Sequence, residues 1–243
     1  MILMINELTE ESAVSNPSDL GYESIASGYR RGVWDIVFKV GKYCCLSEGK
    51  ALLADLGCGP GHNADALMRE GVANAAVLLD ISPTMVVRAL TEVREGIPLG
   101  VCGDMAHTPL RDGCVDAVLM IASLHHVVGR EARLEALKES FRILKGGGTA
   151  LIAVWARWQV RLLPLLIKGL IRYALKQSET PWDVVRCSKK GHVCREYHLY
   201  SLKELVNDVR QAGFKVVESG TYAAPGRKGL PRKNYYVIGI KPN

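Results

Sequence analysis

The chain has no uncharged apolar run of about 18 residues, the length that a membrane-spanning helix needs. Residues 1–20 also lack a basic segment followed by an apolar run, so nothing there predicts a secretory signal peptide. The 7 cysteines are scattered and contain no CxxC pair, which excludes a zinc or redox motif of that type. We therefore expect a cytoplasmic protein with reduced, mostly buried thiols and no metal site.

Large-scale disorder is also excluded by composition. Of the 243 residues, 48% are apolar and 23% charged, enough to bury one sizeable core. Acidic residues are scarce toward the C-terminus: residues 155–243 contain 17 Lys and Arg against 6 Asp and Glu, a net +11, whereas residues 1–154 carry −5. Such asymmetry indicates a polyanionic partner contacted by one half, although a solvated basic surface explains it equally well.

Short apolar runs alternate with amphipathic segments between residues 51 and 155. Strands are predicted at 51–56, 75–80, 98–104, 115–123 and 149–155, and helices at 34–45, 63–71, 83–93 and 130–144. This alternation predicts right-handed βαβ units and a parallel sheet with helices on both faces. Residues 1–20 are polar after the first few and form a lead-in to a single domain over 21–243.

The alternation breaks after Trp155. Residues 159–177 are apolar, with four basic residues on one helical face opposite an apolar one: Arg161, Lys168, Arg172 and Lys176. A loop rich in Lys and His follows, then a helix at 202–213 and a strand pair at 214–219 and 234–241. We predict that a helical and loop segment over about 156–200 is inserted on the substrate side of the sheet domain.

The segment DLGCGPG (55–61) lies between a predicted strand and a predicted helix, the context in which a glycine-rich loop binds a ligand. Its glycines permit a tight turn, and Asp80 ends the next strand, where an acid binds ribose hydroxyls. A dinucleotide enzyme uses the same features. Asp55 favours a cationic amino-acid tail over a pyrophosphate, Asp104 ends the third strand where an adenine amino group would lie, and the chain ends in a predicted β-hairpin.

With DLGCGPG, LLDIS, GDM and LKGGG in this order, residues 22–155 resemble the class I S-adenosylmethionine-dependent methyltransferases. The resemblance implies an α/β fold: a Rossmann-like, doubly wound sheet of seven strands, mostly parallel with the last strand antiparallel. It also implies S-adenosylmethionine as the cofactor. The implied cofactor-binding residues are Tyr22, Asp55, Gly57, Cys58, Gly59, Gly61, Asp80, Ile81, Asp104, Met105 and Ala122.

Motifs outside this core resemble one tRNA methyltransferase family, which completes 5-carboxymethyluridine at the wobble position as its methyl ester. They are YESIASGY (22–29), RRGVW (30–34), VWARWQ (154–159), REYHLYS (195–201), QAGFKVVESG (211–220) and NYYVIGIK (234–241). The resemblance implies that the substrate is the tRNA anticodon region. It also implies a heterodimer with a small zinc-binding activator protein, docked near residues 98–102. Val33 departs from the family pattern, which has a proline before Trp34.

Eight residues are candidates for the acceptor side: Arg31, His125, His126, Trp155, Arg195, Tyr197, His198 and Asn234. An arginine can orient a carboxylate, aromatic rings can stack on a flipped-out base, and an asparagine can read its polar edge. Each has an alternative role: Arg195 can pair with Glu196, and His198 can pack at a helix start that Ser201 caps. The two adjacent histidines are common in the superfamily and carry little weight.

Two other functions stay open. In a small-molecule or lipid methyltransferase, the apolar segment 160–177 would cap a hydrophobic pocket. In a noncatalytic RNA-binding module, the core would be vestigial. The same segment could dock on an anionic membrane, but because phosphate contacts explain its basic residues better, we do not expect a membrane partner.

Overall fold

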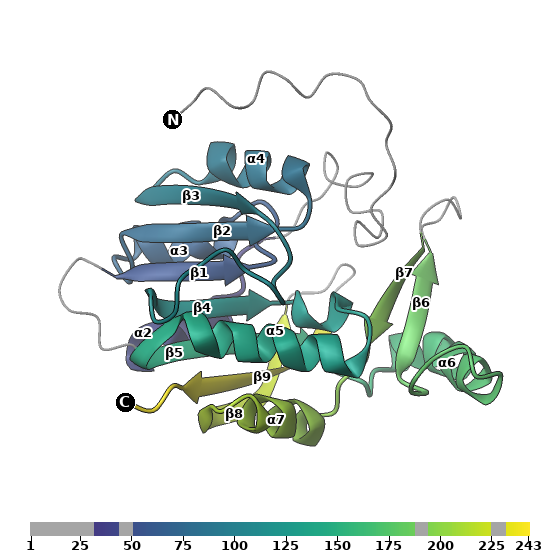
Figure 1. Cartoon of the computed structure of the whole chain (residues 1–243). Coiled ribbons are helices and arrows are strands. Elements are labelled where there is room, and N and C mark those ends of the chain that lie inside the picture. Colours follow the sequence, from purple (N-terminus) through teal and green to yellow (C-terminus); the bar gives the residue numbers. More distant parts are fainter. Residues whose placement is uncertain (1–31, 44–50, 188–193, 225–231) are drawn as a thin grey trace.

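A computed structural model describes residues 32–43, 51–187, 194–224 and 232–243. Within these residues, seven strands form one sheet in the order β3-β2-β1-β4-β5-β9-β8 (Figure 1). The strands are β1 (Leu52–Leu56), β2 (Ala75–Asp80), β3 (Ile97–Cys102), β4 (Val115–Ile121), β5 (Leu144–Trp155), β8 (Lys215–Ala224) and β9 (Arg232–Ile240). Strands β1 to β5 pair in parallel, and β9 is antiparallel to both neighbours. The predicted mostly parallel, seven-stranded sheet is confirmed.

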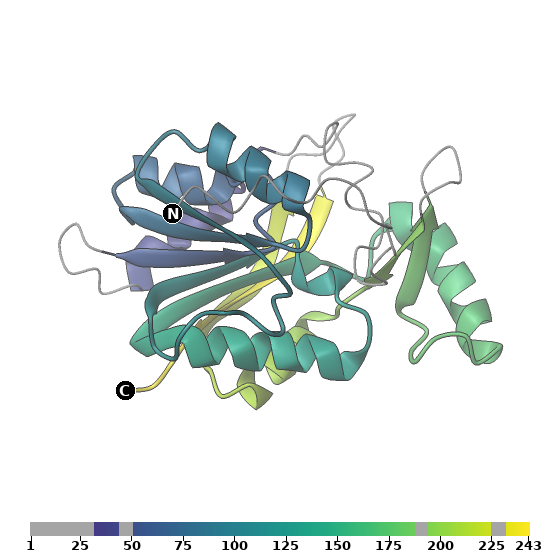
Figure 2. The same cartoon turned by 45° about the horizontal axis from the view of Figure 1, so that its top comes forward.

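Helices cover both faces of this sheet (Figures 1 and 2). One face carries η2 (Asp35–Lys39), α2 (Val40–Tyr43), α3 (His62–Arg69) and α4 (Pro83–Glu92), and the other carries α5 (Arg130–Ile143) and α7 (Leu202–Gln211). The core is split accordingly: Leu53 packs with the first set and Ala54 with the second, because successive strand residues point to opposite faces. The sheet is therefore buried from both sides, which leaves its edges for function.

Local signals set where two of these helices begin. Ser82 Oγ accepts a hydrogen bond from Met85 N, and Pro83 suits the first turn of α4. Ser201 and Glu204 form a reciprocal capping box at the start of α7. By contrast, β5 begins at Leu144 and not at 149 as predicted, so the glycines at 146–148 lie within a strand.

The segment after Trp155 contains more regular structure than predicted. It begins with η4 (Val160–Leu162) and α6 (Leu163–Ala174), and continues with an antiparallel hairpin of β6 (Asp183–Cys187) and β7 (Cys194–His198). The prediction of a loop here is wrong, because Val184 and Tyr197 on the hairpin pack against Leu166 of α6. This tertiary packing stabilises strands where the sequence pattern did not predict them.

A disulfide bond joins Cys187 to Cys194, which are register partners on β6 and β7 with Cα atoms 3.9 Å apart. Cys102, in contrast, is free and exposed. The prediction of reduced, mostly buried thiols is therefore wrong at these positions. Cysteine spacing along the chain does not show that a hairpin brings two of them together.

Candidate functional site

Asp80 ends β2 and ties the glycine loop to the sheet. Its Oδ2 accepts a hydrogen bond from Gly59 N at 2.9 Å, and its Oδ1 accepts one from Ser82 N at 3.0 Å. The loop is held again where Gly57 N donates to Leu79 O at 2.8 Å. The carboxyl ends of parallel strands form the edge where folds of this class bind ligands. Asp80 therefore shapes the loop at the edge where we expect a ligand.

Asp55 lies in β1 immediately before this loop and is almost completely buried. Its Oδ2 has no hydrogen-bond partner among the described residues. Burial, and after it the charge of the neighbouring Asp80, raise the pKa of Asp55 to about 7. A buried carboxylate oxygen without a donor is costly, and a cationic group beside it offsets that cost. Asp55 thus fits the ammonium group of an amino-acid tail.

Gly57 and Ala122 show how closely the loops at this edge approach one another. A Cβ on Gly57, whose φ is +78°, would collide with Ser123 Cβ and lie 3.1 Å from Met105 Cε. Ala122, directly after β4, has a φ of +56°, which is rare for a residue with a side chain. Its N–H still donates to Ala153 O at 2.8 Å. The loops after β1, β3 and β4 therefore meet at one point.

The other predicted cofactor residues surround this point. Asp104 follows β3, and its Oδ1 accepts a hydrogen bond from the backbone two residues on, at 2.9 Å. Ile81 directly follows β2, and Gly61 precedes α3 in the left-handed conformation. Cys58 packs its side chain into the core, so it can meet a ligand only through its backbone. Tyr22 lies outside the described residues.

This arrangement fits S-adenosylmethionine feature by feature. Asp55 offers a buried carboxylate oxygen to the ammonium group. The acids that end β2 and follow β3 lie at the same edge, where they would accept hydrogen bonds from the ribose hydroxyls and the adenine amino group of such a ligand. The loop between them has glycine where a side chain would clash.

We predict that cofactor affinity rises with pH as Asp55 ionises. Only the ionised carboxylate attracts the ammonium group, which itself stays protonated below about pH 7.5. With a pKa of about 7, the ionised share of Asp55 grows about fifteenfold between pH 5.5 and pH 7.0. Isothermal titration calorimetry with S-adenosylmethionine should therefore show a dissociation constant that falls by about this factor.

The matched variant is Asp55→Asn, which should bind weakly and with little pH dependence over the same range. If its affinity changed with pH as steeply as that of the natural protein, another group would be responsible. Ionisation of Asp55 also destabilises the folded chain when no ligand is bound. Because the pKa of Asp55 is higher in the folded chain than its unfolded value of about 4, stability falls as pH rises from about 4 to 7.

Four rings form an aromatic wall beside this edge: Trp155 at the end of β5, Tyr197 on β7, and His125 and His126 on η3 (Leu124–His126). Trp155 and Tyr197 stack with ring centroids 5.0 Å apart and planes 7° apart. His125 lies 4.9 Å from Trp155, and His126 lies 4.7 Å from Tyr197. The structure thus brings together four of the predicted acceptor residues.

Most of the aromatic wall is inaccessible to solvent, however. Trp155, Tyr197 and His125 are buried, whereas His126 is partly exposed. The backbone N–H of Trp155 donates to His125 Nδ1 at 3.4 Å, so the neutral His125 ring carries its proton on Nε2. The two large rings stack on each other, and a ligand base would meet the wall through His126 first.

Asn234 and Arg195 lie next to the wall. Asn234 is the register partner of Trp155; its Nδ2 donates to the Arg232 carbonyl at 2.9 Å, and its Oδ1 has no hydrogen-bond partner among the described residues. Arg195 precedes Tyr197 by two residues on β7, so both side chains leave the same face of the strand. Glu196, the predicted alternative partner of Arg195, has an ion pair with Arg172 at 3.6 Å. Arg31 lies outside the described residues.

His198 does not belong to the wall. Its Nδ1 lies 2.6 Å from Asp183 Oδ1 and its Nε2 lies 2.8 Å from Glu204 Oε1, and the ring is buried. Burial favours neutral carboxyl groups, but the hydrogen bonds with His198 outweigh it and hold the pKa values of Asp183 and Glu204 below their usual range. The prediction that His198 faces the acceptor is wrong, since both of its nitrogens are occupied.

Arg133 and Arg157 complete this buried charged network around His198. Arg157 Nη2 lies 2.5 Å from Glu204 Oε2, and Arg133 Nη1 lies 3.9 Å from Asp183 Oδ1. The network joins the β6–β7 hairpin to α5, α7 and the end of β5. The network therefore fixes the position of the hairpin that carries Arg195 and Tyr197. Nothing in the sequence indicated it, because its members are far apart in the chain.

One of the four basic residues predicted to share a helical face, Arg161, lies at the aromatic wall. The Arg161 guanidinium carbon lies 5.9 Å from the centroid of the Trp155 ring, and its Nε donates to Gln159 Oε1 at 3.0 Å. Gln159 also accepts from Lys233 N at 3.2 Å. Arg161 is thus a candidate contact that the sequence placed only on a helical face. The signal for it was the VWARWQ motif, which ends at Gln159.

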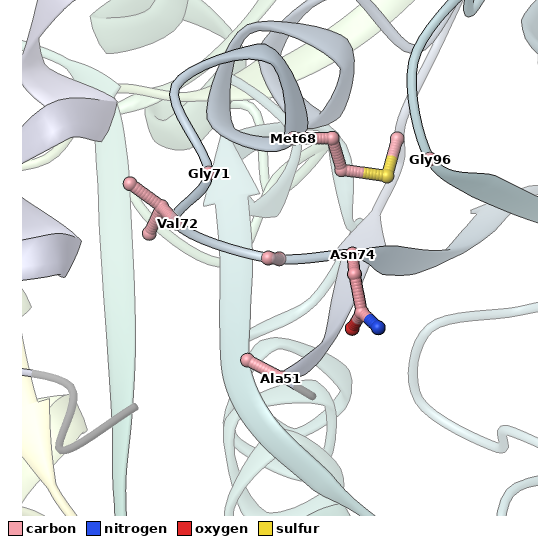
Figure 3. A pocket seen from close by; sticks show the side chains of 7 residues that line it. Ala51, Met68, Gly71, Val72, Asn74 and Gly96 are labelled. Atoms are coloured by element: carbon pink, nitrogen blue, oxygen red, sulfur yellow. The ribbon is translucent and has the colours of Figure 1, made fainter. Parts of the chain in front are cut away.

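A shallow pocket of about 280 Å³ lies at the opposite edge of the sheet (Figure 3). Its lining comes from the residues before β1, β2 and β3: Ala51, Met68, Gly71, Val72, Ala73, Asn74 and Gly96. None of them is titratable, and the amino ends of parallel strands are not where this fold class binds ligands. The described residues contain no group of three or more side chains placed to hold a metal ion.

Comparison with known proteins agrees with this geometry. A family model described as "Methyltransferase domain" matches residues 54–152. The tRNA (carboxymethyluridine(34)-5-O)-methyltransferase ALKBH8 of Mus musculus is 37% identical over 145 residues, which cover 57% of this chain but only 20% of that protein. The tRNA (carboxymethyluridine(34)-5-O)-methyltransferase of Schizosaccharomyces pombe is 28% identical over 239 residues, which cover 90% of this chain and 94% of that protein.

Solved structures share the fold. A SAM-dependent methyltransferase of Methanosarcina mazei has a TM-score of 0.72 at 18% identity, covering 87% of this chain and 99% of its own. A putative methyltransferase of Haloferax volcanii, solved in complex with the Trm112 methyltransferase activator, has a TM-score of 0.65 at 19% identity, covering 92% and 95%. Residues 54–152 thus match the methyltransferase domain family, and the chain has the fold of S-adenosylmethionine-dependent methyltransferases and is similar in sequence to tRNA carboxymethyluridine methyltransferases.

Proposed function

We propose that the protein methylates the carboxylate of 5-carboxymethyluridine at the wobble position of tRNA, with S-adenosylmethionine as the methyl donor. The observation that carries this proposal is the relationship to the fission yeast enzyme of that name over 90% of the chain, because it includes the acceptor-side segments and not the cofactor core alone. The aromatic wall and Asn234 support it, because they lie together at the end of β5, and Arg195 leaves the same face of β7 as Tyr197.

A carboxylate acceptor makes few chemical demands on the residues present. With a pKa near 4 it is ionised at pH 7, so no general base is needed. S-adenosylmethionine would supply an electrophilic methyl group for transfer to the carboxylate oxygen, a reaction that moves no proton. What the chain must provide is alignment and a dry pocket, effects worth about 7 to 11 kcal/mol in favourable cases. The buried wall supplies the dry surface, and Arg195 supplies an orienting charge.

The basic C-terminal part is suited to tRNA. Residues 155–243 carry a net +11, and Arg161, Arg195 and Lys233 lie on or beside the acceptor side. Phosphate contacts release counterions, so binding to tRNA should weaken steeply with salt. The basic residues between 227 and 233 are further candidates for phosphate contacts, and half of them lie outside the described residues.

We also propose that an activator protein docks on the β3 edge. β3 is an edge strand, and Ile97 and Leu99 expose their side chains along it. On α4, which packs against this strand, Val87 and Leu90 are also exposed. An apolar, unpaired strand edge is a liability for a protein on its own. The support from the Haloferax volcanii neighbour is that it was solved with a Trm112 activator.

The test is mass spectrometry of tRNA nucleosides from cells with and without the gene. We expect the methyl ester of 5-carboxymethyluridine to disappear without it and the free acid to accumulate. Expression of Arg195→Ala should restore less than about a tenth of the ester, because a charge-assisted hydrogen bond to the acceptor is lost. Arg210→Ala, an exposed arginine on α7, is the matched control and should restore it fully.

If the tRNA nucleosides were unchanged in cells without the gene, the proposed substrate would be wrong. Full restoration by Arg195→Ala would remove only the role given to this arginine.

A further inference from the structure

Helix α6 exposes an apolar face to solvent. Leu163, Ile167, Leu170 and Ile171 each leave more than half of their surface accessible, and Val160 in the preceding turn is 91% exposed. At 100° per residue, the four helix positions fall within one arc of about 100°. Figures 1 and 2 both show α6 on the outer side of the β6–β7 hairpin, away from the large sheet.

A different and narrower face holds α6 to the protein. Leu166 and Gly169 are buried, and a Cβ on Gly169 would lie 2.6 Å from Pro181 O, so the helix packs tightly at this point. The apolar face therefore neither fills the core nor caps the cofactor edge, which removes the predicted reason for a lipid or small-molecule pocket. A patch of large apolar side chains on the surface indicates an interaction site.

The segment around the apolar face is basic. Lys168 lies about 60° beyond this face, Arg161 and Lys176 lie just outside the two ends of α6, all three are exposed, and residues 159–177 contain no Asp or Glu. Trp158 and Tyr173 lie at the two ends of the segment and are exposed as well. Aliphatic side chains flanked by basic and aromatic ones are the composition of helices that lie in the interface of an anionic bilayer.

We propose that α6 docks flat on the surface of an anionic lipid membrane, with its apolar face between the headgroups and with Lys168 and the basic residues at its two ends on the phosphates. RNA fits this face poorly, because phosphates do not compensate the exposure of four aliphatic side chains. A second copy also fits poorly, because a two-fold contact through this face would bring together two segments that each carry four basic residues and no acidic one. No helix in the described part of the chain can cross a membrane, so the contact is peripheral.

The exposed face changes the expectation from the sequence that no membrane partner exists. The sequence alone predicts a helix with one basic side and one apolar side, and the apolar side of such a helix would be buried in the protein. The structure buries a third face instead, and charge complementarity then selects the partner.

The test is co-sedimentation of the full chain with vesicles of phosphatidylcholine containing about 30% phosphatidylserine, and with vesicles of phosphatidylcholine alone. We expect binding to the first and at least tenfold weaker binding to the second. The double variant Ile167→Gln and Leu170→Gln should lose at least tenfold in partitioning to the anionic vesicles. These side chains are 53% and 52% exposed, so the variant should keep its thermal unfolding midpoint.

The matched control is Val87→Gln and Leu90→Gln on α4, two apolar residues that are 60% and 42% exposed. It should bind vesicles as the natural protein does. Lys168→Gln and Lys176→Gln should each weaken binding about fivefold in low salt. Vesicle binding that is absent, or that the α4 variant weakens as much as the α6 variant, would overturn the proposal.

Two further results would also overturn it. If the α6 variant lost affinity for tRNA to the same extent, the face would belong to RNA. If the natural protein were a dimer by analytical ultracentrifugation and the α6 variant a monomer, the face would belong to a second copy.

Discussion

Replacing Asp80 by alanine should lower the affinity for S-adenosylmethionine by about 100-fold or more. The carboxylate of Asp80 is expected to accept hydrogen bonds from the ribose, and it already accepts them from Gly59 N and Ser82 N. Each charge-assisted hydrogen bond is worth about 1.5 to 3 kcal/mol, so two lost bonds account for this factor. Loss of the Gly59 contact also releases the loop that approaches the ligand. Calorimetry with the cofactor measures the effect directly.

Asp116→Ala is the matched control. Asp116 Oδ2 also accepts a backbone hydrogen bond, from Leu52 N at 2.9 Å, but β4 begins beside it and so it lies at the amino edge of the sheet. This variant should lose stability without losing cofactor affinity. If a folded Asp80→Ala protein bound the cofactor normally, the cofactor site would not be at this edge.

Replacing Asp183 by alanine should destabilise the protein by about 3 to 5 kcal/mol, the cost of breaking a buried ion pair from one side. Asp183, His198 and Arg133 are all buried, and the variant leaves His198 and Arg133 without this carboxylate. Urea unfolding at pH 7 measures the loss. The same variant should lower methyl transfer, because the hairpin that carries Arg195 and Tyr197 is no longer fixed.

Asp112→Ala serves as the control for this variant. Asp112 is also paired with an arginine, Arg142, but its side chain is 81% exposed, so the loss should stay below about 1 kcal/mol. The effect at Asp183 also depends on pH. Because its folded pKa lies below the unfolded value of about 4, its stabilisation is present above pH 4 and is lost as pH falls further. Equal losses in both variants would show that the buried network contributes nothing special.

The cofactor edge follows from local sequence. A strand, a glycine loop and a helix succeed one another within a few residues, and Asp80 and Asp104 mark the ends of the next two strands. Strand and helix periods are short, so a single stretch of chain carries each signal. Parallel pairing then brings the strand ends to one edge, which is why residues from separate motifs could be assigned to one site before the fold was known.

The acceptor side was visible only in part. The motifs named Trp155, Tyr197 and Asn234, and the structure places them together because β5 pairs with β9 and the hairpin packs on Trp155. His198 was misassigned, because a histidine near aromatic residues gives no indication of which carboxylates surround it. Strand alternation separates it from Tyr197, and a strand was not expected there.

The sequence by itself determined the sheet, the glycine loop and the acids that follow its strands, because local periodicity and turn chemistry specify these features. Only the tertiary structure decided the disulfide, the charged network behind the hairpin and the outward direction of the apolar face of α6. Each of these depends on contacts between segments that are separate in the chain or on which face of a helix is buried. The composition of α6 does not depend on which of its faces packs against the protein, so only the packing decides which face is exposed to solvent.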